Sequence, residues 1–304
     1  MSKWTAEAIP DLTGRTFVIT GANSGLGLES TRMLAAHGAH VVMTARDRLK
    51  GEAAAARVGQ DVPGASLELR ILDLADLESV REFAEGLRND AVPVDVLINN
   101  AGVMMTPQRD TKQGFEMQFG TNHLGHFALT GLLLDRLAAG NDPRVVTVSS
   151  TLHKKGEIDF DDLMHRGRYS PTAAYARSKV ANLLFGLELQ RRLTAAGSPV
   201  RSLMAHPGYS NTNLQFAGPT GWRKAMMRIG NPLFAQKPAI GALAQVRAAV
   251  APDVAGGQYY GSAALFESRG FPELVRPSRL AQDPQVAARL WEESEKLTGV
   301  VYGL

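Results

Sequence analysis

A tyrosine and a lysine stand four positions apart in the stretch Tyr175-Ala176-Arg177-Ser178-Lys179. On a helix, this spacing puts the phenol and the ammonium group on the same face. A free tyrosine has a pKa of about 10 and is a poor base at neutral pH, but a cation held nearby favours the phenolate. The pair is therefore suited to exchanging a proton with an alcohol or a carbonyl oxygen. Because this spacing is often incidental on an amphipathic helix, its meaning depends on the elements around it.

Those elements predict an α/β fold. Short apolar runs alternate with longer helical patterns, which is typical of strands that helices cover on both faces. Repeated βα units with right-handed crossovers give a single doubly wound (Rossmann) parallel sheet, and ligands bind beyond the carboxyl ends of its strands. We predict strands at residues 16–20, 40–44, 67–72, 94–98, 145–148 and 200–204, and helices at 26–37, 77–87, 115–137 and 173–195.

Composition excludes several classes of protein. Hydrophobic residues make up 44% of the 304 positions, which predicts a substantial core, and the net charge is only +3, without a basic stripe for nucleic acid. The absence of cysteine excludes disulfides and thiolate metal sites and suits a reducing compartment. The first residues lack the apolar core of a signal peptide, and no run reaches the length of a membrane span. We therefore expect a soluble, cytoplasmic protein without a stable membrane anchor.

The first strand ends in the glycine-rich turn Thr20-Gly21-Ala22-Asn23-Ser24-Gly25-Leu26-Gly27. Glycines let the backbone approach a pyrophosphate closely, and the N-terminus of the following helix offers free N–H groups. The spacing differs from the GxGxxG fingerprint, and no Lys-Ser/Thr pair of a P-loop follows. A dinucleotide site is favoured by the position between strand and helix, although a methyltransferase or a plain structural turn also fits this much.

The ends of the second and third strands refine the choice of cofactor. NAD sites commonly carry an acidic residue after the second strand, whereas an arginine there accommodates the extra phosphate of NADP. Here Ala45 occupies the acidic position and Arg46 follows it, which predicts NADP(H) over NAD, although the neighbouring Asp47 weakens this argument and Arg46 could be an ordinary surface residue. Asp73 ends the third strand, where it could reach an adenine amino group or simply cap the next helix.

Several further motifs, in order, resemble the short-chain dehydrogenase/reductase family between about residues 14 and 260. The glycine-rich turn is similar to its cofactor turn, and Asn99-Asn100-Ala101-Gly102 is similar to its NNAG element. Asn122 and the Tyr175–Lys179 pair are similar to its catalytic residues. Together these arguments predict a cofactor site made of Gly21, Asn23, Ser24, Gly25, Leu26, Gly27, Arg46, Asp73, Leu74, Asn100, Ala101, Gly102, Tyr175, Lys179, Pro207, Gly208 and Thr212, with no metal.

The resemblance also implies catalytic roles. Tyr175 would be the general acid and base, and Lys179 would lower its pKa and bind the nicotinamide ribose. Ser150 would polarise the carbonyl group, and Asn122 would hold a water that links Lys179 to solvent. Ser149 remains an alternative to Ser150, which we choose from its spacing.

One departure from the family concerns the distance between serine and tyrosine, which is 25 residues here and commonly shorter. The longer gap, filled by the insert 152–172, resembles the retinol dehydrogenase and WW-domain oxidoreductase branch and, more distantly, light-dependent protochlorophyllide reductases. The stretches Asn122-His123-Leu124-Gly125-His126-Phe127 and His206-Pro207-Gly208 are similar to that branch too. For His123 and His126, helix packing is favoured over a zinc site, because no third ligand at metal spacing accompanies them.

We expect one domain over 1–304, with a cofactor and catalytic core at 14–212, a substrate lid at about 213–237, and C-terminal helices, the last strand and a tail at 238–304. The lid carries apolar residues that cover a substrate or simply pack (Phe216, Trp222, Met226, Met227 and Phe234), and a membrane-surface contact with Arg223, Lys224 and Arg228 is less favoured. The predicted function is an NADP(H)-dependent alcohol dehydrogenase or carbonyl reductase for a fairly apolar small molecule. The alternatives are a non-enzymatic NADP-binding sensor or interaction module and, with less support, a methyltransferase. The long helices 115–137 and 173–195 are apolar enough to pair in a homo-oligomer, a dimer or tetramer.

Overall fold

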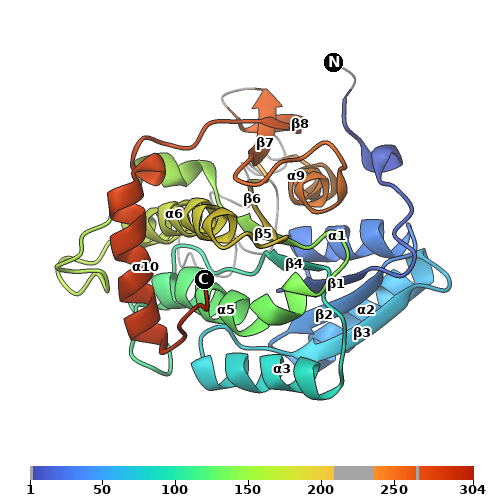
Figure 1. The fold of residues 1–304 in the computed structure, drawn as a ribbon, viewed down its shortest axis with the longest axis horizontal. Helices are drawn as coiled ribbons and strands as arrows, with labels where there is room; N and C mark the ends of the chain where they lie inside the picture. Colours follow the sequence, from blue (N-terminus) through green and yellow to red (C-terminus); the bar gives the residue numbers. More distant parts are fainter. Residues whose placement is uncertain (1–2, 209–235, 265–266) are drawn as a thin grey trace.

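Eight strands form one sheet in the order β3-β2-β1-β4-β5-β6-β7-β8 in the computed structural model, which describes residues 3–208, 236–264 and 267–304 (Figure 1). Strands β1 to β7 pair in parallel, and β8 pairs antiparallel with β7. The parallel sheet that we predicted therefore has one antiparallel edge strand, since the short connection after β7 leaves no room for a crossover helix. The bounds are β1 Thr16–Ile19, β2 His40–Ala45, β3 Ser66–Ile71, β4 Val96–Asn99, β5 Arg144–Val148, β6 Arg201–Ala205, β7 Tyr259–Ala264 and β8 Arg269–Leu274.

Helices cover both faces of this sheet, because neighbouring strand residues point to opposite sides. Val18 packs in the core under α3, α5 and α6, whereas Phe17 and Ile19 pack in the core under α1 and α9. Among the helices of the described residues, none is both long and apolar enough to cross a bilayer. The helix bounds are α1 Gly25–Ala35, α2 Arg48–Asp61, α3 Leu77–Asn89, α4 Met117–Phe119, α5 Gly125–Ala138, α6 Pro171–Ala195, α9 Pro238–Val250 and α10 Pro284–Thr298.

Local sequence explains where several helices begin. Asp47 caps α2 by accepting from the Lys50 amide at 3.1 Å, and Asp76 caps α3 by accepting from the Glu78 amide at 3.1 Å. Asp283 caps α10 and is followed by Pro284, whose fixed φ suits the first helical position. These caps fix the starts of the helices that follow the strand ends.

The long helix that we predicted at 115–137 is present from Met117 to Ala138, but its hydrogen-bond pattern is not regular. It begins with α4, passes through the π turn Gly120–Leu124, and continues as α5. In that turn the Gly125 amide bonds to the Gly120 carbonyl, five residues back. A Cβ on Gly125 would lie 2.5 Å from the Leu74 carbonyl oxygen, so the helix can approach the end of the β3 segment only with glycine here. The π turn carries Asn122, and such turns often occur at functional sites.

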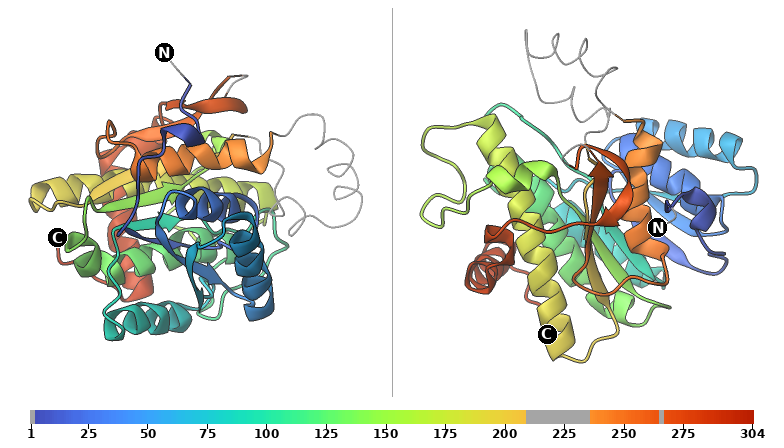
Figure 2. Two further views of the ribbon diagram at one scale, coloured as in Figure 1. Left: turned by 90° about the vertical axis from the view of Figure 1, so that its right-hand side faces the viewer. Right: turned by 90° about the horizontal axis from the view of Figure 1, so that it is seen from above.

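The C-terminal part of the chain covers α5 and α6. Helix α10 lies beside α6 on its outer side (Figures 1 and 2). Beyond α10, the hydroxyl of Tyr302 donates to the Phe127 carbonyl at 2.6 Å, and its ring packs on Trp291 and Phe127. Part of the helix surface that we expected to be available for subunit pairing is therefore buried within the chain.

Candidate active site

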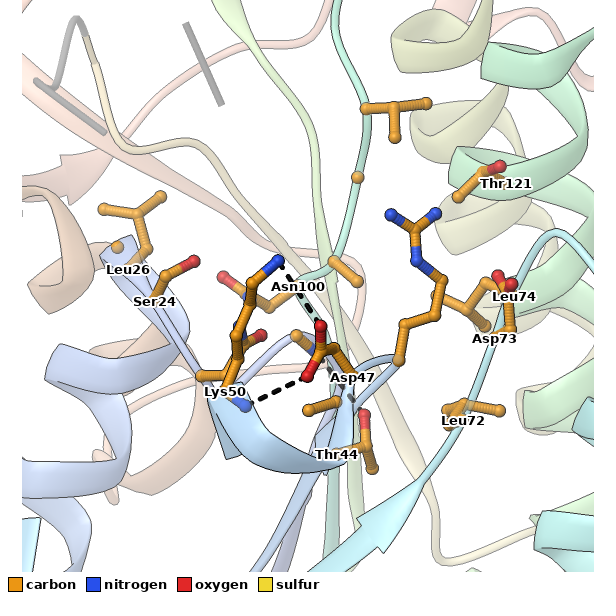
Figure 3. A pocket seen from close by; sticks show the side chains of 18 residues that line it. Ser24, Leu26, Thr44, Asp47, Lys50, Leu72, Asp73, Leu74, Asn100 and Thr121 are labelled. Atoms are coloured by element: carbon orange, nitrogen blue, oxygen red, sulfur yellow. Dashed lines mark hydrogen bonds and ion pairs between the residues drawn. The ribbon is translucent and has the colours of Figure 1, made fainter. Parts of the chain in front are cut away.

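A groove opens where β1 lies between β2 and β4, the point at which the strand order reverses. Ligands of doubly wound sheets bind at such a point. In Figure 3, Ser24 and Leu26 lie on one side of this groove and Leu72, Asp73 and Leu74 lie on the other. The groove is lined by Gly21, Asn23, Ser24, Gly25, Leu26, Thr44, Ala45, Arg46, Asp47, Lys50, Leu72, Asp73, Leu74, Asn100, Ala101, Gly102, Val103 and Thr121.

The glycine-rich turn forms one wall and leaves donors available. Gly21 and Gly25 adopt positive φ angles of 65° and 56°, which side chains disfavour. A Cβ on Gly27 would lie 2.4 Å from the Gly21 carbonyl oxygen, so only glycine lets α1 pack this close to the turn. Ser24 is the N-cap of α1, yet its side chain makes no capping hydrogen bond. A phosphate at this helix start would meet a free hydroxyl and unpaired N–H groups.

The floor of the groove is tied to the same turn through Thr20. The Thr20 hydroxyl oxygen accepts from the amides of Asn100 at 2.8 Å and Ala101 at 2.9 Å. The Asn100 side chain donates back to the Thr20 carbonyl at 2.7 Å. The Asn-Asn-Ala-Gly element is therefore fixed against the end of β1.

Two cations border the groove at the end of β2. Arg46 is exposed and lines the groove, and Lys50 lines it from the first turn of α2. Asp47, which weakened our cofactor argument, is occupied as the α2 cap and lies 3.4 Å from the Lys50 ammonium group (Figure 3). The Lys50 amide, as the largest cause, holds the pKa of Asp47 below its usual value. An anionic group of a ligand could therefore be bound by cationic side chains at this end of the groove.

Asp73 does not cap α3, because Asp76 does so. Its carboxylate accepts from the Ala75 amide at 3.0 Å, and its own main-chain amide donates to the Ser79 hydroxyl at 3.0 Å. Asp73 lines the groove, and its contact with an adenine amino group stays a prediction.

Tyr175 and Lys179 lie on α6, one turn apart, and are 4% and 3% exposed. The Lys179 ammonium nitrogen lies 5.7 Å from the centre of the Tyr175 ring and donates to the Val148 carbonyl at 3.2 Å. Its distance from a Cβ built on Gly102 would be 3.6 Å, so the ammonium group adjoins the floor of the groove. Tyr175 and Lys179, which we predicted as part of the cofactor site, do not line the groove themselves, but Lys179 adjoins its floor at Gly102.

Burial controls the protonation of this pair. It raises the pKa of Tyr175 to about 12, and the side chain of Ser150 offsets this only in part. Burial also lowers the pKa of Lys179 to about 8. We expected Lys179 to lower the pKa of Tyr175; the pKa is raised instead, because the loss of water around the buried phenol outweighs the nearby cation. Tyr175 is consequently a protonated phenol at neutral pH.

The structure distinguishes the two serines at the end of β5. Ser149 is buried and donates its hydroxyl to the Lys179 carbonyl at 2.7 Å. Ser150 is half-buried, accepts weakly from the Leu152 amide at 3.3 Å, and interacts with Tyr175. Behind it, His153 donates from Nδ1 to the Ser150 carbonyl at 2.7 Å. Ser150, as we chose from the spacing, is the serine that faces the phenol.

Asn122 is completely buried beside Gly102, and its side-chain nitrogen and oxygen both have hydrogen-bond partners. Its oxygen accepts from the Val103 amide at 2.8 Å, and its nitrogen donates to the Val103 carbonyl and to the Ser178 hydroxyl, both at 2.9 Å. These bonds join the π turn to the groove floor and to α6. The Asn122 main-chain carbonyl accepts from His126 Nδ1 at 2.9 Å, and the role of Asn122 in holding a water stays a prediction.

The insert is held against α6 and against the segment after β4. Arg177 on α6 donates to the carbonyls of Leu163 at 3.2 Å and Glu157 at 3.3 Å. The Tyr169 hydroxyl donates to the Glu116 carboxylate at 2.9 Å and lies 3.1 Å from the Thr106 carbonyl oxygen. These bonds attach the insert to the part of α6 that carries the Tyr–Lys pair.

The remaining predicted residues lie beyond β6 or outside the described residues. Gly208 has a φ of 64° and donates its amide to His206 Nδ1 at 3.2 Å, and the Pro207 carbonyl accepts from Gln236 at 2.5 Å. Neither residue lines the groove as described. Thr212 and the lid residues Phe216, Trp222, Arg223, Lys224, Met226, Met227, Arg228 and Phe234 lie outside the described residues.

Sequence reasoning missed several groups of this site. Thr20 was treated as part of a turn, although its hydroxyl organises the floor, and Lys50 was not considered as a partner of Arg46. Thr44, Val103 and Thr121 also line the groove. Lys50 could have been found from its position four residues after Arg46, across the start of α2. No local sequence pattern indicated that the other missed residues line or organise the groove.

Comparisons with known proteins agree with this arrangement. Residues 15–218 match the model of the short chain dehydrogenase family. Human retinol dehydrogenase 13 is 42% identical over 95% of this chain and 86% of its own length, and mouse polyprenol dehydrogenase is 41% identical over 96% and 86%. The crystal structure of an uncharacterized protein from Mycobacterium paratuberculosis has 48% identity, a TM-score of 0.84 and full coverage of both chains. The chain therefore belongs to the short-chain dehydrogenase family, in the branch of the retinol dehydrogenases.

Proposed function

We propose that the protein interconverts an alcohol and a carbonyl group on a fairly apolar small molecule, with NADP(H) as cofactor and Tyr175 as general acid and base. Family membership makes the chain an oxidoreductase that acts on CH–OH donors. The cofactor choice, the catalytic residue and the substrate class are the parts that we add. The observation that carries them is the meeting of Tyr175, Lys179 and Asn122 with the floor of the dinucleotide-type groove at Gly102.

The residues of the groove fit a dinucleotide. Close packing at Gly27 leaves no room for a side chain, and the Ser24 hydroxyl and the first amides of α1 are available to a pyrophosphate. When bound, the nicotinamide supplies or accepts the hydride. We assign the other parts of the reaction to side-chain and main-chain groups of the protein.

In carbonyl reduction, the Ser150 hydroxyl orients the substrate oxygen and Tyr175 gives it a proton. With a pKa of about 12, the Tyr175 phenol carries that proton throughout the neutral range. Lys179, with a pKa of about 8, is mostly charged at pH 7 and favours the phenolate that is left behind. The Asn122 carbonyl then orders a water through which the proton is restored. Alcohol oxidation uses the same groups in reverse.

Preference for NADP(H) is supported by the two cations at the end of β2. Arg46 provides a planar guanidinium group that suits a phosphate, and Lys50 lies at the same end of the groove, paired with Asp47 at 3.4 Å. No acidic side chain stands at the preceding position, which is Ala45. Asp47 is used as a helix cap and does not compete for Arg46 through a hydrogen bond in the described part of the chain.

An apolar substrate is supported by the relatives, whose names identify a retinol and a polyprenol as their alcohols. The experiment that tests the proposal follows NADPH absorbance with a panel of aldehydes and ketones of graded chain length, and repeats it with NADH. Turnover of apolar carbonyl compounds with NADPH supports the proposal. NADPH binding without turnover of any of them favours the alternative, a non-enzymatic sensor or interaction module.

Assembly and location are also proposals. A homo-oligomer, dimer or tetramer, would have to use a surface other than the parts of α5 and α6 that α10 and Tyr302 cover. Light scattering of the purified protein measures this directly. A cytoplasmic location without a stable membrane anchor suits the cysteine-free sequence, and cell fractionation tests it.

A further inference from the structure

Two histidines follow Asn122 in the sequence, one in the π turn and one at the start of α5. The proposed reaction uses neither of them. His123 and His126 are both 1% exposed. Their hydrogen bonds lead in opposite directions, one away from the site and one into it. This difference separates a residue that supports the fold from a residue that acts on the site.

His126 lies between the cofactor turn and Asn122. Its Nδ1 is 2.9 Å from the Asn122 carbonyl oxygen, and its Nε2 is 2.8 Å from the Thr20 hydroxyl oxygen. A carbonyl can only accept, so Nδ1 must carry the hydrogen. In the neutral ring Nε2 is then an acceptor, and the Thr20 hydroxyl must donate to it.

The hydrogen bonds of Thr20 agree with this assignment. Its hydroxyl oxygen already accepts from the amides of Asn100 and Ala101, at 2.8 and 2.9 Å, which uses both lone pairs. Its own hydrogen is left for His126, at a shorter distance than the Ile98 carbonyl at 3.3 Å. A directed chain results, from the floor amides through Thr20 and His126 to the Asn122 carbonyl, and bonds aligned in this way strengthen one another.

The chain depends on a neutral imidazole. A proton on Nε2 would face a hydroxyl oxygen whose lone pairs are both occupied. Burial is the main cause that lowers the pKa of His126, to about 4, and the positive charge of Lys179 lowers it further. His126 is therefore neutral at the pH at which the enzyme would work.

We propose that His126 is a positioning residue, which fixes the Asn122 carbonyl relative to the cofactor floor and so places the water that serves Lys179 and Tyr175. This rests on the proposed function, because the water path matters only if Tyr175 exchanges protons. The Asn122 side chain is itself fixed by bonds to Val103 and Ser178, so His126 acts on the main-chain carbonyl, to which its Nδ1 donates at 2.9 Å.

His123 offers the matched comparison. Its Nε2 lies 2.9 Å from the hydroxyl oxygen of Ser294 on α10, and that hydroxyl donates to the Leu290 carbonyl at 2.7 Å. His123 Nε2 therefore carries the hydrogen, the opposite tautomer to His126. This bond attaches α10 to the π turn and does not involve the groove, so Ser294→Ala removes a buried hydrogen bond without touching the site.

The experiment compares His126→Gln, His126→Asn and Ser294→Ala in the full chain. The amide of asparagine reaches the place of Nδ1 and can still donate to Asn122, whereas the amide of glutamine reaches the place of Nε2 and cannot. We expect His126→Gln to lower kcat about tenfold, with NADPH affinity within about twofold of wild type. His126→Asn should restore most of kcat. Ser294→Ala should lower Tm and keep kcat.

Several outcomes overturn the inference. It fails if His126→Gln keeps the wild-type kcat, or if both His126 variants lose kcat and NADPH affinity in proportion to Tm, as a structural role requires. A wild-type protein that neither binds NADPH nor reduces a carbonyl compound removes the proposed function as well, whereas an active wild type with an unimpaired His126→Gln variant removes only this inference.

A measurement on the wild type decides the matter if the variants do not fold. Nitrogen-15 NMR of the histidine rings distinguishes the two neutral tautomers. We expect the Nδ1–H form for His126 and the Nε2–H form for His123 at pH 7, and a shift of the His126 signals on addition of NADP⁺. The hydrogen-bond chain from the cofactor floor to Asn122 would be ruled out if His126 had the Nε2–H form. It would also be ruled out if the His126 signals did not shift on addition of NADP⁺.

Discussion

Ser149 donates its hydroxyl hydrogen to the main-chain carbonyl of Lys179 at 2.7 Å, which turns it away from the substrate side and leaves Ser150 facing Tyr175. The two adjacent serines therefore have separate roles. We expect Ser150→Ala to lower kcat about a hundredfold, the usual effect of removing one donor to a reacting oxygen. Ser149→Ala should instead cost about 1 kcal/mol of unfolding free energy and leave kcat nearly unchanged. Steady-state kinetics and urea unfolding of both variants measure this, and equal kinetic losses would contradict the assignment.

Removal of the Tyr175 hydroxyl tests the proton donor. Tyr175→Phe keeps the ring that packs beside Lys179 but has no proton to give. We expect turnover to fall by at least about a hundredfold, since general acid catalysis contributes that much, with little change in NADPH affinity. Fluorescence titration with NADPH serves as the control for an intact groove. Turnover close to wild type would refute the role of Tyr175.

Cofactor preference should depend on Arg46. A charged hydrogen bond to phosphate contributes about 1.5–3 kcal/mol, so Arg46→Ala should weaken NADPH binding by roughly tenfold to a hundredfold and leave NADH binding unchanged. Arg48, which is exposed on α2 but does not line the groove, provides the matched control Arg48→Ala. If NADPH and NADH affinities change equally in Arg46→Ala, or if wild type binds NADH more tightly, the NADP assignment is wrong.

The charge of Lys179 should limit carbonyl reduction at alkaline pH. Burial lowers the pKa of Lys179 to about 8, so its positive charge is present below that value and is lost above it. Because kcat/KM reports the free enzyme, its value for NADPH should fall as the pH rises through about 8. A pH profile between 6 and 10 in constant ionic strength checks this, and a flat profile through pH 9 would be inconsistent with it.

Acid should unfold the protein through its buried histidines. Burial is the main cause that lowers the pKa of His123 to about 3 and those of His126 and His153 to about 4. Below the unfolded value of about 6.5, the unfolded chain binds more protons than the folded one, so stability falls as the pH is lowered. Each histidine contributes a slope of at most about 1.4 kcal/mol per pH unit. Urea unfolding at pH 7, 6 and 5 measures the slope, and His123→Phe should make it shallower.

Local patterns predicted the features that depend on local chemistry. The apolar runs placed β1, β2, β5 and β6 to within one or two residues, because strands buried on both faces tolerate few other compositions. The glycine spacing after β1 located the groove, since only glycine fits at Gly27.

Features that depend on distant contacts were not predictable in this way. The bond between Thr20 and His126 joins positions 106 apart in sequence, and the two histidines looked equivalent until their partners were known. The Lys179 neighbour alone predicted a lowered pKa for Tyr175. The pKa is raised instead, because the whole fold buries the phenol. The π turn at 120–124 was predicted as a regular helix, because a single additional residue in a turn leaves the apolar periodicity almost unchanged.

The covering of α5 by the end of the chain has a consequence for how the protein is made. The bond between His123 and Ser294 joins positions 171 apart, and that between Phe127 and Tyr302 joins positions 175 apart. During synthesis, α5 therefore leaves the ribosome long before α10 and Tyr302 have been made. The part of the Phe127 ring that they cover is exposed during that time. Such long-range contacts slow folding and expose apolar surface to aggregation. The hydrogen bond that ties the turn carrying Asn122 to α10 can form only after Ser294 has been synthesised.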